Sequence, residues 1–435
     1  MEYSLTRLGN NLRLVTIPMP SVSSATVLIL VGTGSRYETK KINGISHFLE
    51  HMVYKGTKSR PNPIDIPSEI EGIGGAWNAF TAKDHTGFYI KAANTHITVM
   101  FDILSDVLQN SLFKSEEIEK EKGVIVEEIH MYEDMPIQKV SEVYDDLVYG
   151  DQPLGWDIAG LPSIVRSFDR NTFIDYWKKH YTPSNMVVVV AGGIGDVSGS
   201  GLKGAKGLTL RAMAEKYFGK LIDKPAGKAV PAVIEQSGPR VKIKHKKTEQ
   251  AHMCLGVPAY SLSHPDRYNL ALMATILGGG ASSRLFDEIR EKRGYAYYCR
   301  AGSDQYTDTG TFVSQSGLVL SKVDEAIKVI LEQFYLLASG KRPVAKKELE
   351  RAKELLKGHL ILGLEDSKNV AGHFGTDELI EKTMRTPEEV IKRIDEVTSE
   401  GIIKVAEDLF VSDKLNLAMI GPFDNPDHFQ TLLEL

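Results

Sequence analysis

The strongest constraint on the fold of this chain is that the second half of its sequence approximately repeats the first. In the first half, a helical pattern at 43–54 leads into Lys-Gly-Thr-Lys-Ser at 55–59. In the second half, strand patterns at 241–244 and 251–256 lead to a helical pattern at 268–277 and then to Gly-Gly-Gly-Ala-Ser-Ser. The segments 118–134 and 348–366 also resemble each other, and both end in Glu-Asp. This repetition predicts two α+β halves derived from one unit.

Length and local pattern divide the chain into an N-terminal part, 1–222, a linker, 223–238, and a C-terminal part, 239–435. A chain of 435 residues exceeds one ordinary hydrophobic core and suits two to four domains. The linker is predicted from its prolines and glycines among Ala, Lys and Gln. In the first part we expect a hairpin over 3–18, strands at 24–31, 74–81, 86–92 and 185–191, and helices at 43–54, 95–109, 115–134, 162–179 and 208–217.

A glycine-rich stretch at 192–207 contains the string G-x-G-x-x-G at 199–204. In a dinucleotide-binding loop such glycines turn the chain directly from a strand into a helix. Here five residues separate Gly193, at the end of the predicted strand, from Gly199. We therefore interpret the stretch as a loop.

The composition argues against nucleic-acid and membrane partners. The net charge is -5 and the isoelectric point is near 6.2, whereas nucleic-acid binders usually carry a basic excess. The basic run at 240–247 alternates apolar and charged residues, which predicts a strand with one solvated face. The longest apolar runs are far shorter than the roughly 20 residues needed to cross a bilayer. Because we find no export or transit pattern and only two cysteines, we expect a cytoplasmic protein without disulfides.

The clearest chemical signal is the inverted His-x-x-Glu-His motif formed by His47, Glu50 and His51. Positions i, i+3 and i+4 share one face of a helix, so these three side chains project to the same side. Two imidazoles one turn apart can bind zinc at about 2.0 to 2.1 Å, and Glu50 is then placed to deprotonate the water that zinc activates. The second half has Ala, Ala and Thr at the aligned positions 271, 274 and 275. The sequence therefore predicts one zinc ion per chain.

A third protein ligand must come from elsewhere in the chain. The acidic helix expected at 115–134 offers seven candidates: Glu116, Glu117, Glu119, Glu121, Glu127, Glu128 and Glu133. Spacing alone does not choose among them. Glu121 and Glu128 are seven positions apart, two turns on one face, so one can bind the metal while the other supports the site.

These motifs resemble those of the M16 metallopeptidases, the pitrilysin or inverzincin family, and especially its mitochondrial-processing-peptidase-like M16B branch. The resemblance begins with Gly-Ser-Arg-Tyr-Glu at 34–38 and the fourteen-residue run at 44–57 that contains the motif. It continues through Gly-Gly-Ala-Trp-Asn-Ala-Phe-Thr at 74–81, the acidic run at 119–129 and Tyr-Thr-Pro-Ser-Asn-Met at 181–186. The run at 282–297 extends it into the second half, so it covers nearly the whole chain.

The resemblance implies a fold and a metal site. The fold is two homologous α/β-sandwich halves of the LuxS/MPP-like metallohydrolase type, each a mostly antiparallel sheet packed with helices. In the metal site, Glu128 is the third zinc ligand and Glu121 is its supporting acid. The implied activity is that of a zinc metalloendopeptidase that cuts short or unfolded polypeptides.

The resemblance also implies how substrate is held and how the transition state is stabilised. An extended peptide adds to the edge strand within 75–81, where Asn78, Ala79 and Phe80 contact it. Arg290 and Tyr297 stabilise the tetrahedral intermediate at the zinc site of a second chain. We therefore expect a homodimer whose active sites are completed in trans.

The sequence leaves two other functions open. Proteins of this fold also serve as non-catalytic core or assembly subunits, although a scaffold has no need for the complete metal set. A catalytic subunit that requires a different partner chain is the other alternative, and the presence of both Arg290 and Tyr297 argues against it.

Overall fold

A computed structural model describes residues 1–194 and 209–435, and within them the chain forms two compact units. The first unit contains residues 1–129, 157–230 and 361–388, and the second contains 130–156, 231–360 and 389–435. The continuous parts expected from the sequence, 1–222 and 239–435, do not coincide with these units. Each half of the chain contributes a segment to the opposite unit, namely 130–156 and 361–388.

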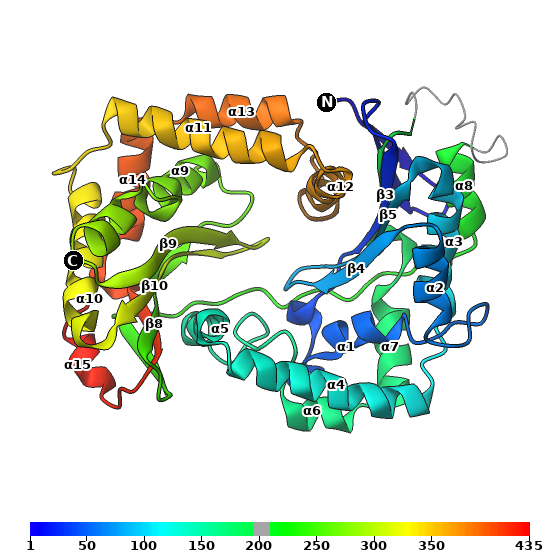
Figure 1. Cartoon of the computed structure of the whole chain (residues 1–435), viewed down its shortest axis with the longest axis horizontal. Coiled ribbons are helices and arrows are strands. Elements are labelled where there is room, and N and C mark those ends of the chain that lie inside the picture. Colours follow the sequence, from blue (N-terminus) through cyan, green and yellow to red (C-terminus); the bar gives the residue numbers. More distant parts are fainter. Residues whose placement is uncertain (195–208) are drawn as a thin grey trace. The chain divides into compact units, whose positions relative to one another are not determined.

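The first unit is built on a six-stranded sheet with the strand order β1-β2-β6-β3-β5-β4. Strands β3, β5 and β4 of this sheet are labelled in Figure 1. All neighbouring strands are antiparallel except β2 and β6, which are parallel. The hairpin expected over 3–18 is present, with Asn11 at φ 68° in its turn. The strands are β1 Ser4–Arg7, β2 Arg13–Pro18, β3 Ser24–Val31, β4 Ala76–Thr81, β5 Thr86–Ala93 and β6 Met186–Gly192.

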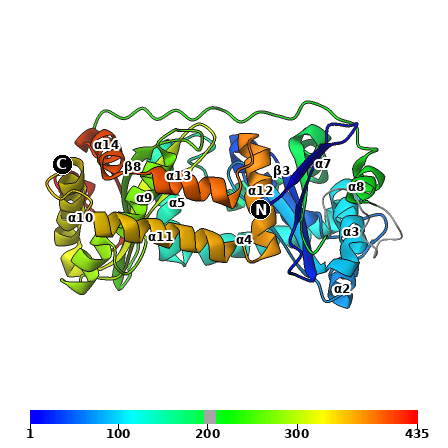
Figure 2. The same ribbon diagram turned by 90° about the horizontal axis from the view of Figure 1, so that it is seen from above.

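Helices cover both faces of the first sheet. Figure 2 shows α12 on one face of β3 and α3 on the other. Gly375 in α12 lets that helix approach the sheet closely, because a Cβ atom there would lie 2.8 Å from side-chain carbons of Leu30 and Val189. The helices of this unit are α1 Ile45–Met52, α2 Asp65–Gly72, α3 Ile97–Asn110, α4 Ser115–Glu133, α6 Pro162–Ser167, α7 Arg170–His180, α8 Leu210–Phe218 and α12 Ser367–Thr376.

The single helix expected at 162–179 is wrong, because the chain forms α6 and α7 there. Asp169 lies between them in extended conformation, and its side chain accepts a hydrogen bond from the Thr172 amide. The Asp169 amide in turn donates a hydrogen bond to the hydroxyl oxygen of Thr172, which completes a capping box. A new helix therefore begins at Arg170.

The second unit repeats this plan with a five-stranded sheet ordered β7-β11-β8-β10-β9. Only β7 and β11 are parallel. The strand order matches β2-β6-β3-β5-β4 of the first unit, so the predicted repeat of two mostly antiparallel, helix-packed halves is confirmed. The strands are β7 Arg240–His245, β8 Gln250–Ala259, β9 Ala296–Gln305, β10 Gly310–Val319 and β11 Asn416–Gly421.

Helices also cover both faces of the second sheet. Helix α5 packs on β7, β8 and β11, while α9, α10 and α14 pack on the other face. The helices of this unit are α5 Pro136–Tyr149, α9 Arg267–Gly278, α10 Val323–Ala338, α11 Lys346–Gly363, α13 Pro387–Glu396, α14 Ser399–Leu409 and α15 Pro426–Gln430, together with the π-helix η5 Phe286–Glu291.

The basic strand β7 is not simply solvated on its charged face. Lys242 pairs with Asp146 and Lys244 pairs with Glu133, both acids of the segment 130–156 in the same unit. The predicted strand is therefore correct, but two of its lysines also form ion pairs with the segment 130–156. Most of the glycine-rich stretch at 192–207 lies outside the described residues. No helix in the described part of the chain is both long and apolar enough to cross a membrane.

Candidate metal centre

The metal motif lies on α1, whose opposite face is anchored in the core of the first unit. Ile45, Phe48, Leu49 and Met52 are buried, so the face that carries the motif is directed away from this apolar contact. The helix begins after Gly44, which has φ +97°. A Cβ atom at Gly44 would lie 2.5 Å from the Ala159 carbonyl oxygen, so the tight entry into the helix requires glycine.

Helix α4 brings Glu128 against both histidines of the motif. Nε2 of His47 lies 3.6 Å from Oε1 of Glu128, and Nε2 of His51 lies 3.6 Å from Oε2. These distances exceed those of a good hydrogen bond. They are close to the roughly 3.4 Å that separates neighbouring ligand atoms around a tetrahedral zinc ion with bonds of about 2.1 Å. The His47, His51 and Glu128 donor set therefore fits zinc, and it is the set that the resemblance to the M16 family implies.

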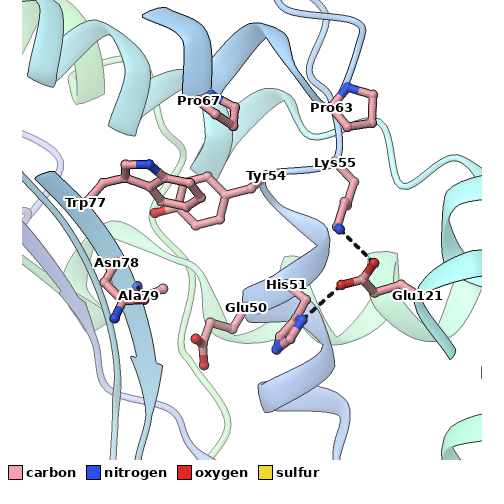
Figure 3. A pocket seen from close by; sticks show the side chains of 10 residues that line it. All are labelled: Glu50, His51, Tyr54, Lys55, Pro63, Pro67, Trp77, Asn78, Ala79 and Glu121. Atoms are coloured by element: carbon pink, nitrogen blue, oxygen red, sulfur yellow. Dashed lines mark hydrogen bonds and ion pairs between the residues drawn. The ribbon is translucent and has the colours of Figure 1, made fainter. Parts of the chain in front are cut away.

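Glu121 lies two turns before Glu128 on the same face of α4, and it fixes the orientation of His51. Oε1 of Glu121 lies 3.0 Å from Nδ1 of His51, and Oε2 lies 2.7 Å from Nζ of Lys55 (Figure 3). Although burial raises the pKa of Glu121, the hydrogen bonds from His51 and Lys55 lower it below its ordinary value. A carboxylate only accepts hydrogen bonds, so His51 donates through Nδ1–H and keeps its Nε2 lone pair for a metal.

Glu50 is held beside the candidate metal ligands by Thr81 at the end of strand β4. The hydroxyl of Thr81 donates a 2.6 Å hydrogen bond to Oε2 of Glu50. Burial raises the pKa of Glu50 above its ordinary value, despite the opposing effects of Thr81 and His47. A carboxylate with a raised pKa is a stronger base, so Glu50 is suited to take a proton.

The charges of His47 and the acids around it stabilise one another. Burial acts to lower the pKa of His47, but Glu128, Glu50 and Asp157 outweigh it and raise that pKa above its ordinary value. The nearby imidazole of His47 in turn holds the pKa of Glu128 below its ordinary value. Nδ1 of His47 is buried and has no partner among the described residues, so Nε2 is the nitrogen directed at the metal site.

Strand β4 lies at one edge of the first sheet and pairs only with β5 among the described strands. Its residues alternate between exposed and partly buried, with Asn78 and Phe80 exposed and Ala79 partly buried. Peptides bind to such free edges through main-chain hydrogen bonds. The strand ends at Thr81, which contacts Glu50.

A cavity of about 250 Å³ opens between this strand and α1 (Figure 3). Its apolar wall contains Tyr54 and Trp77, whose ring centroids are 4.6 Å apart, and two prolines, Pro63 and Pro67. Its remaining lining residues are Glu50, His51, Lys55, Asn78, Ala79 and Glu121. A pocket with one apolar wall thus adjoins both the motif helix and the free edge strand.

Comparison with known proteins agrees with this geometry. The insulinase sequence family, peptidase family M16, matches residues 13–160, and the family of the peptidase M16 inactive domain matches residues 204–356. The chain belongs to peptidase family M16. It is similar to an uncharacterised zinc protease of Bacillus subtilis, at 36% identity over 96% of this chain and 97% of the relative. It is also similar to an uncharacterised zinc protease of Streptomyces coelicolor, at 35% identity over 96% of this chain and 89% of the relative.

Solved structures share the fold of this M16 chain. A protease from Helicobacter pylori superimposes with a TM-score of 0.87 at 23% identity, covering 97% of this chain and 99% of that one. A protein from Pseudomonas fluorescens, described as a peptidase M16 inactive domain, gives a TM-score of 0.86 at 17% identity, with 98% of each chain covered. The two-unit architecture is therefore that of the family.

Arg290 and Tyr297 lie in the second unit, whereas the candidate metal ligands lie in the first. The guanidinium carbon of Arg290 lies 5.7 Å from the centroid of the Tyr297 ring, so the structure brings the predicted pair together. Tyr297 is 75% exposed at the start of β9. An exposed Tyr ring beside an Arg is available to an external group.

Three residues of the centre were missed by sequence reasoning: Lys55, Thr81 and Glu38. Lys55 and Thr81 lie inside motifs that resemble the family, but nothing in their spacing indicates contact with Glu121 or Glu50. Glu38 accepts hydrogen bonds from the amides at the start of α1.

Proposed function

We propose that this chain is a zinc-dependent endopeptidase that hydrolyses extended peptides. The observation that carries this proposal is the convergence of His47, His51 and Glu128, with Glu50 held beside them by Thr81. The relatives named zinc proteases support the same conclusion.

Each residue of the centre has a distinct task in this proposal. His47, His51 and Glu128 would hold the zinc ion. When bound there, zinc polarises a water molecule and lowers the pKa of that water to about 7. Glu50 accepts the proton of the attacking water, and Thr81 keeps its carboxylate directed at the site. Glu121 holds His51 in the tautomer that leaves Nε2 free.

The substrate is held by β4 and the adjoining cavity. An extended peptide would add to the free edge of β4 at Asn78, Ala79 and Phe80, so recognition depends mainly on the peptide backbone. Tyr54 and Trp77 form an apolar wall of the cavity, which favours an apolar side chain next to the scissile bond.

Arg290 and Tyr297 complete the site from a second copy of the chain. A cation and a phenol directed at the developing oxyanion stabilise the tetrahedral intermediate. We therefore extend the proposal to a homodimer of M16B type. The exposure of Tyr297 and its proximity to Arg290 support this extension.

The test uses purified full-length protein and a library of quenched fluorescent peptides. Wild-type protein loaded with zinc should cleave peptides, a chelator should abolish cleavage, and Glu50→Gln should retain zinc but lose activity by several orders of magnitude. Zinc-loaded protein that cleaves nothing would overturn the homomeric enzyme and favour a scaffold or a chain that needs a different partner. For the site in trans, Glu50→Gln and Arg290→Ala proteins are mixed under subunit exchange, and failure to recover activity would contradict sharing.

A further inference from the structure

The carboxylate of Glu38 lies at the N-terminus of α1, although Glu38 is outside that helix. Oε2 accepts hydrogen bonds from the Gly44 amide at 2.7 Å and from Nδ2 of Asn43 at 3.0 Å. Oε1 accepts a hydrogen bond from the Ser46 amide at 2.8 Å. Glu38 is only 3% exposed, so these donors replace water around its charge.

Helix α1 has no capping side chain of its own. The first amides of a helix have no partner inside it and are usually satisfied by a Ser, Thr, Asp or Asn at the N-cap. Here the N-cap residue is Gly44, which has no side chain, and its φ of +97° and close contact with Ala159 exclude a substitute. Glu38 therefore supplies from a distance the acceptors that the helix lacks.

The first turn of α1 is fixed on a second side as well. Oγ of Ser46 lies 2.7 Å from the hydroxyl of Tyr176, which lies 2.8 Å from Oγ1 of Thr33. Nδ2 of Asn43 also donates to the Asp157 carbonyl oxygen at 2.9 Å. Ser46 directly precedes His47, so these contacts fix the backbone from which the first metal ligand projects.

Helix stability alone does not explain a buried carboxylate in this position. Burial raises the pKa of Glu38 to about 7 even though the hydrogen bonds from Ser46, Gly44 and Asn43 lower it. An ionised Glu38 is therefore unfavourable near neutral pH, so its burial costs stability there.

We propose that Glu38 is a positioning residue of the metal centre, which sets the location of His47 through the amides of Gly44 and Ser46. The inference rests on the proposed zinc function. In Glu38→Gln the side-chain NH2 group would face the amide of either Gly44 or Ser46, because glutamine offers only one oxygen. Two donors repel each other at hydrogen-bonding distance, so the first turn must shift and His47 with it.

The experiment measures the zinc affinity of the full-length protein by competition with a chromophoric chelator at pH 8. Glu38→Gln should bind zinc about tenfold more weakly than wild type, the lower end of the loss seen when a group that orients a metal ligand is removed. Asp366→Asn is the matched control. It makes the same acid-to-amide change at the N-cap of α12, where Oδ1 of Asp366 accepts a hydrogen bond from the Lys368 amide. This control should bind zinc like wild type.

The melting temperature of each metal-free protein separates positioning from general destabilisation. The proposal is supported if Glu38→Gln binds zinc more weakly than wild type and melts at no lower temperature than Asp366→Asn. Equal zinc binding by Glu38→Gln and wild type overturns it. Wild-type protein that binds no zinc overturns the proposed function instead, so the two failures are distinguishable.

A second variant decides the matter if Glu38→Gln does not fold. Asn43→Ala removes one donor to Glu38 and the tether to Asp157, but it leaves both amides and the carboxylate in place. It should weaken zinc binding several-fold with little change in melting temperature. Unchanged zinc binding by this variant would overturn the proposal.

Discussion

Burial of Glu38 should make the stability of the first unit depend on pH in a way that one substitution can isolate. Burial raises the pKa of Glu38 from its ordinary 4.5 to about 7. Between these two pKa values, the carboxyl group of Glu38 stays protonated in the folded protein but loses its proton in the unfolded chain. The retained proton adds to the free energy of unfolding. This contribution is fully present below pH 4.5 and is lost as pH rises through 7. Between pH 5 and pH 8 the loss is about 2 to 3 kcal/mol, since one pKa unit corresponds to about 1.4 kcal/mol.

The measurement compares wild type with Glu38→Gln, which does not titrate. Trp77 and Trp177 lie in the first unit and Trp156 in the second, so a Trp156→Phe background makes tryptophan fluorescence report the first unit. Urea unfolding is followed at pH 5 and pH 8 with a chelator present, which excludes stabilisation by bound metal. The free energy of unfolding of wild type should fall by about 2 to 3 kcal/mol more than that of Glu38→Gln. Equal changes in both proteins would refute the argument.

Two further predictions concern residues that support the metal centre. Thr81→Val removes the 2.6 Å hydrogen bond to Glu50, and hydrogen bonds to charged groups are worth about 1.5 to 3 kcal/mol, so kcat should fall roughly tenfold or more. Zinc affinity should not change and Thr81→Ser should retain activity; equal kcat for the Val and Ser variants would contradict the role of the hydroxyl. Glu121→Gln should weaken zinc binding about 10- to 100-fold in the chelator competition. The control Glu119→Gln lies on the exposed side of α4, and equal affinities of the two variants would count against Glu121.

The sequence predicts the local elements well where periodicity and turn chemistry are strong. The helix at 43–54 and the strands at 24–31 and 86–92 are present with ends shifted by few residues. The break between α6 and α7 was missed because it depends on a reciprocal hydrogen bond between Asp169 and Thr172, which a continuous helical pattern hides. Helices α2 and α5 were not predicted at all.

Tertiary contacts explain which parts of the site the sequence could not supply. The motif places His47, Glu50 and His51 on one helix face because their spacing alone decides it. The spacing alone allowed any of seven glutamates of α4 to be the third metal ligand. The packing of α4 against α1 is what brings Glu128 to both histidines. Thr81 contacts Glu50 across 31 positions of sequence, so no local pattern could pair them.

The compact units differ from the continuous parts expected from the sequence, and the burial of the strands gives a physical reason. β6 and β11 are buried along their whole length, which requires apolar cover on both faces of each sheet. On one face of the second sheet that cover is α5, where Val140 and Tyr144 pack with Ile420 of β11. On one face of the first sheet it is α12, which packs on β2, β3 and β6. Because α5 comes from the first half of the sequence and α12 from the second, neither half can bury both faces of its own sheet. The repeat therefore accounts for the matching strand orders of the two sheets, whereas the exchange of these two helices sets the bounds of the two compact units.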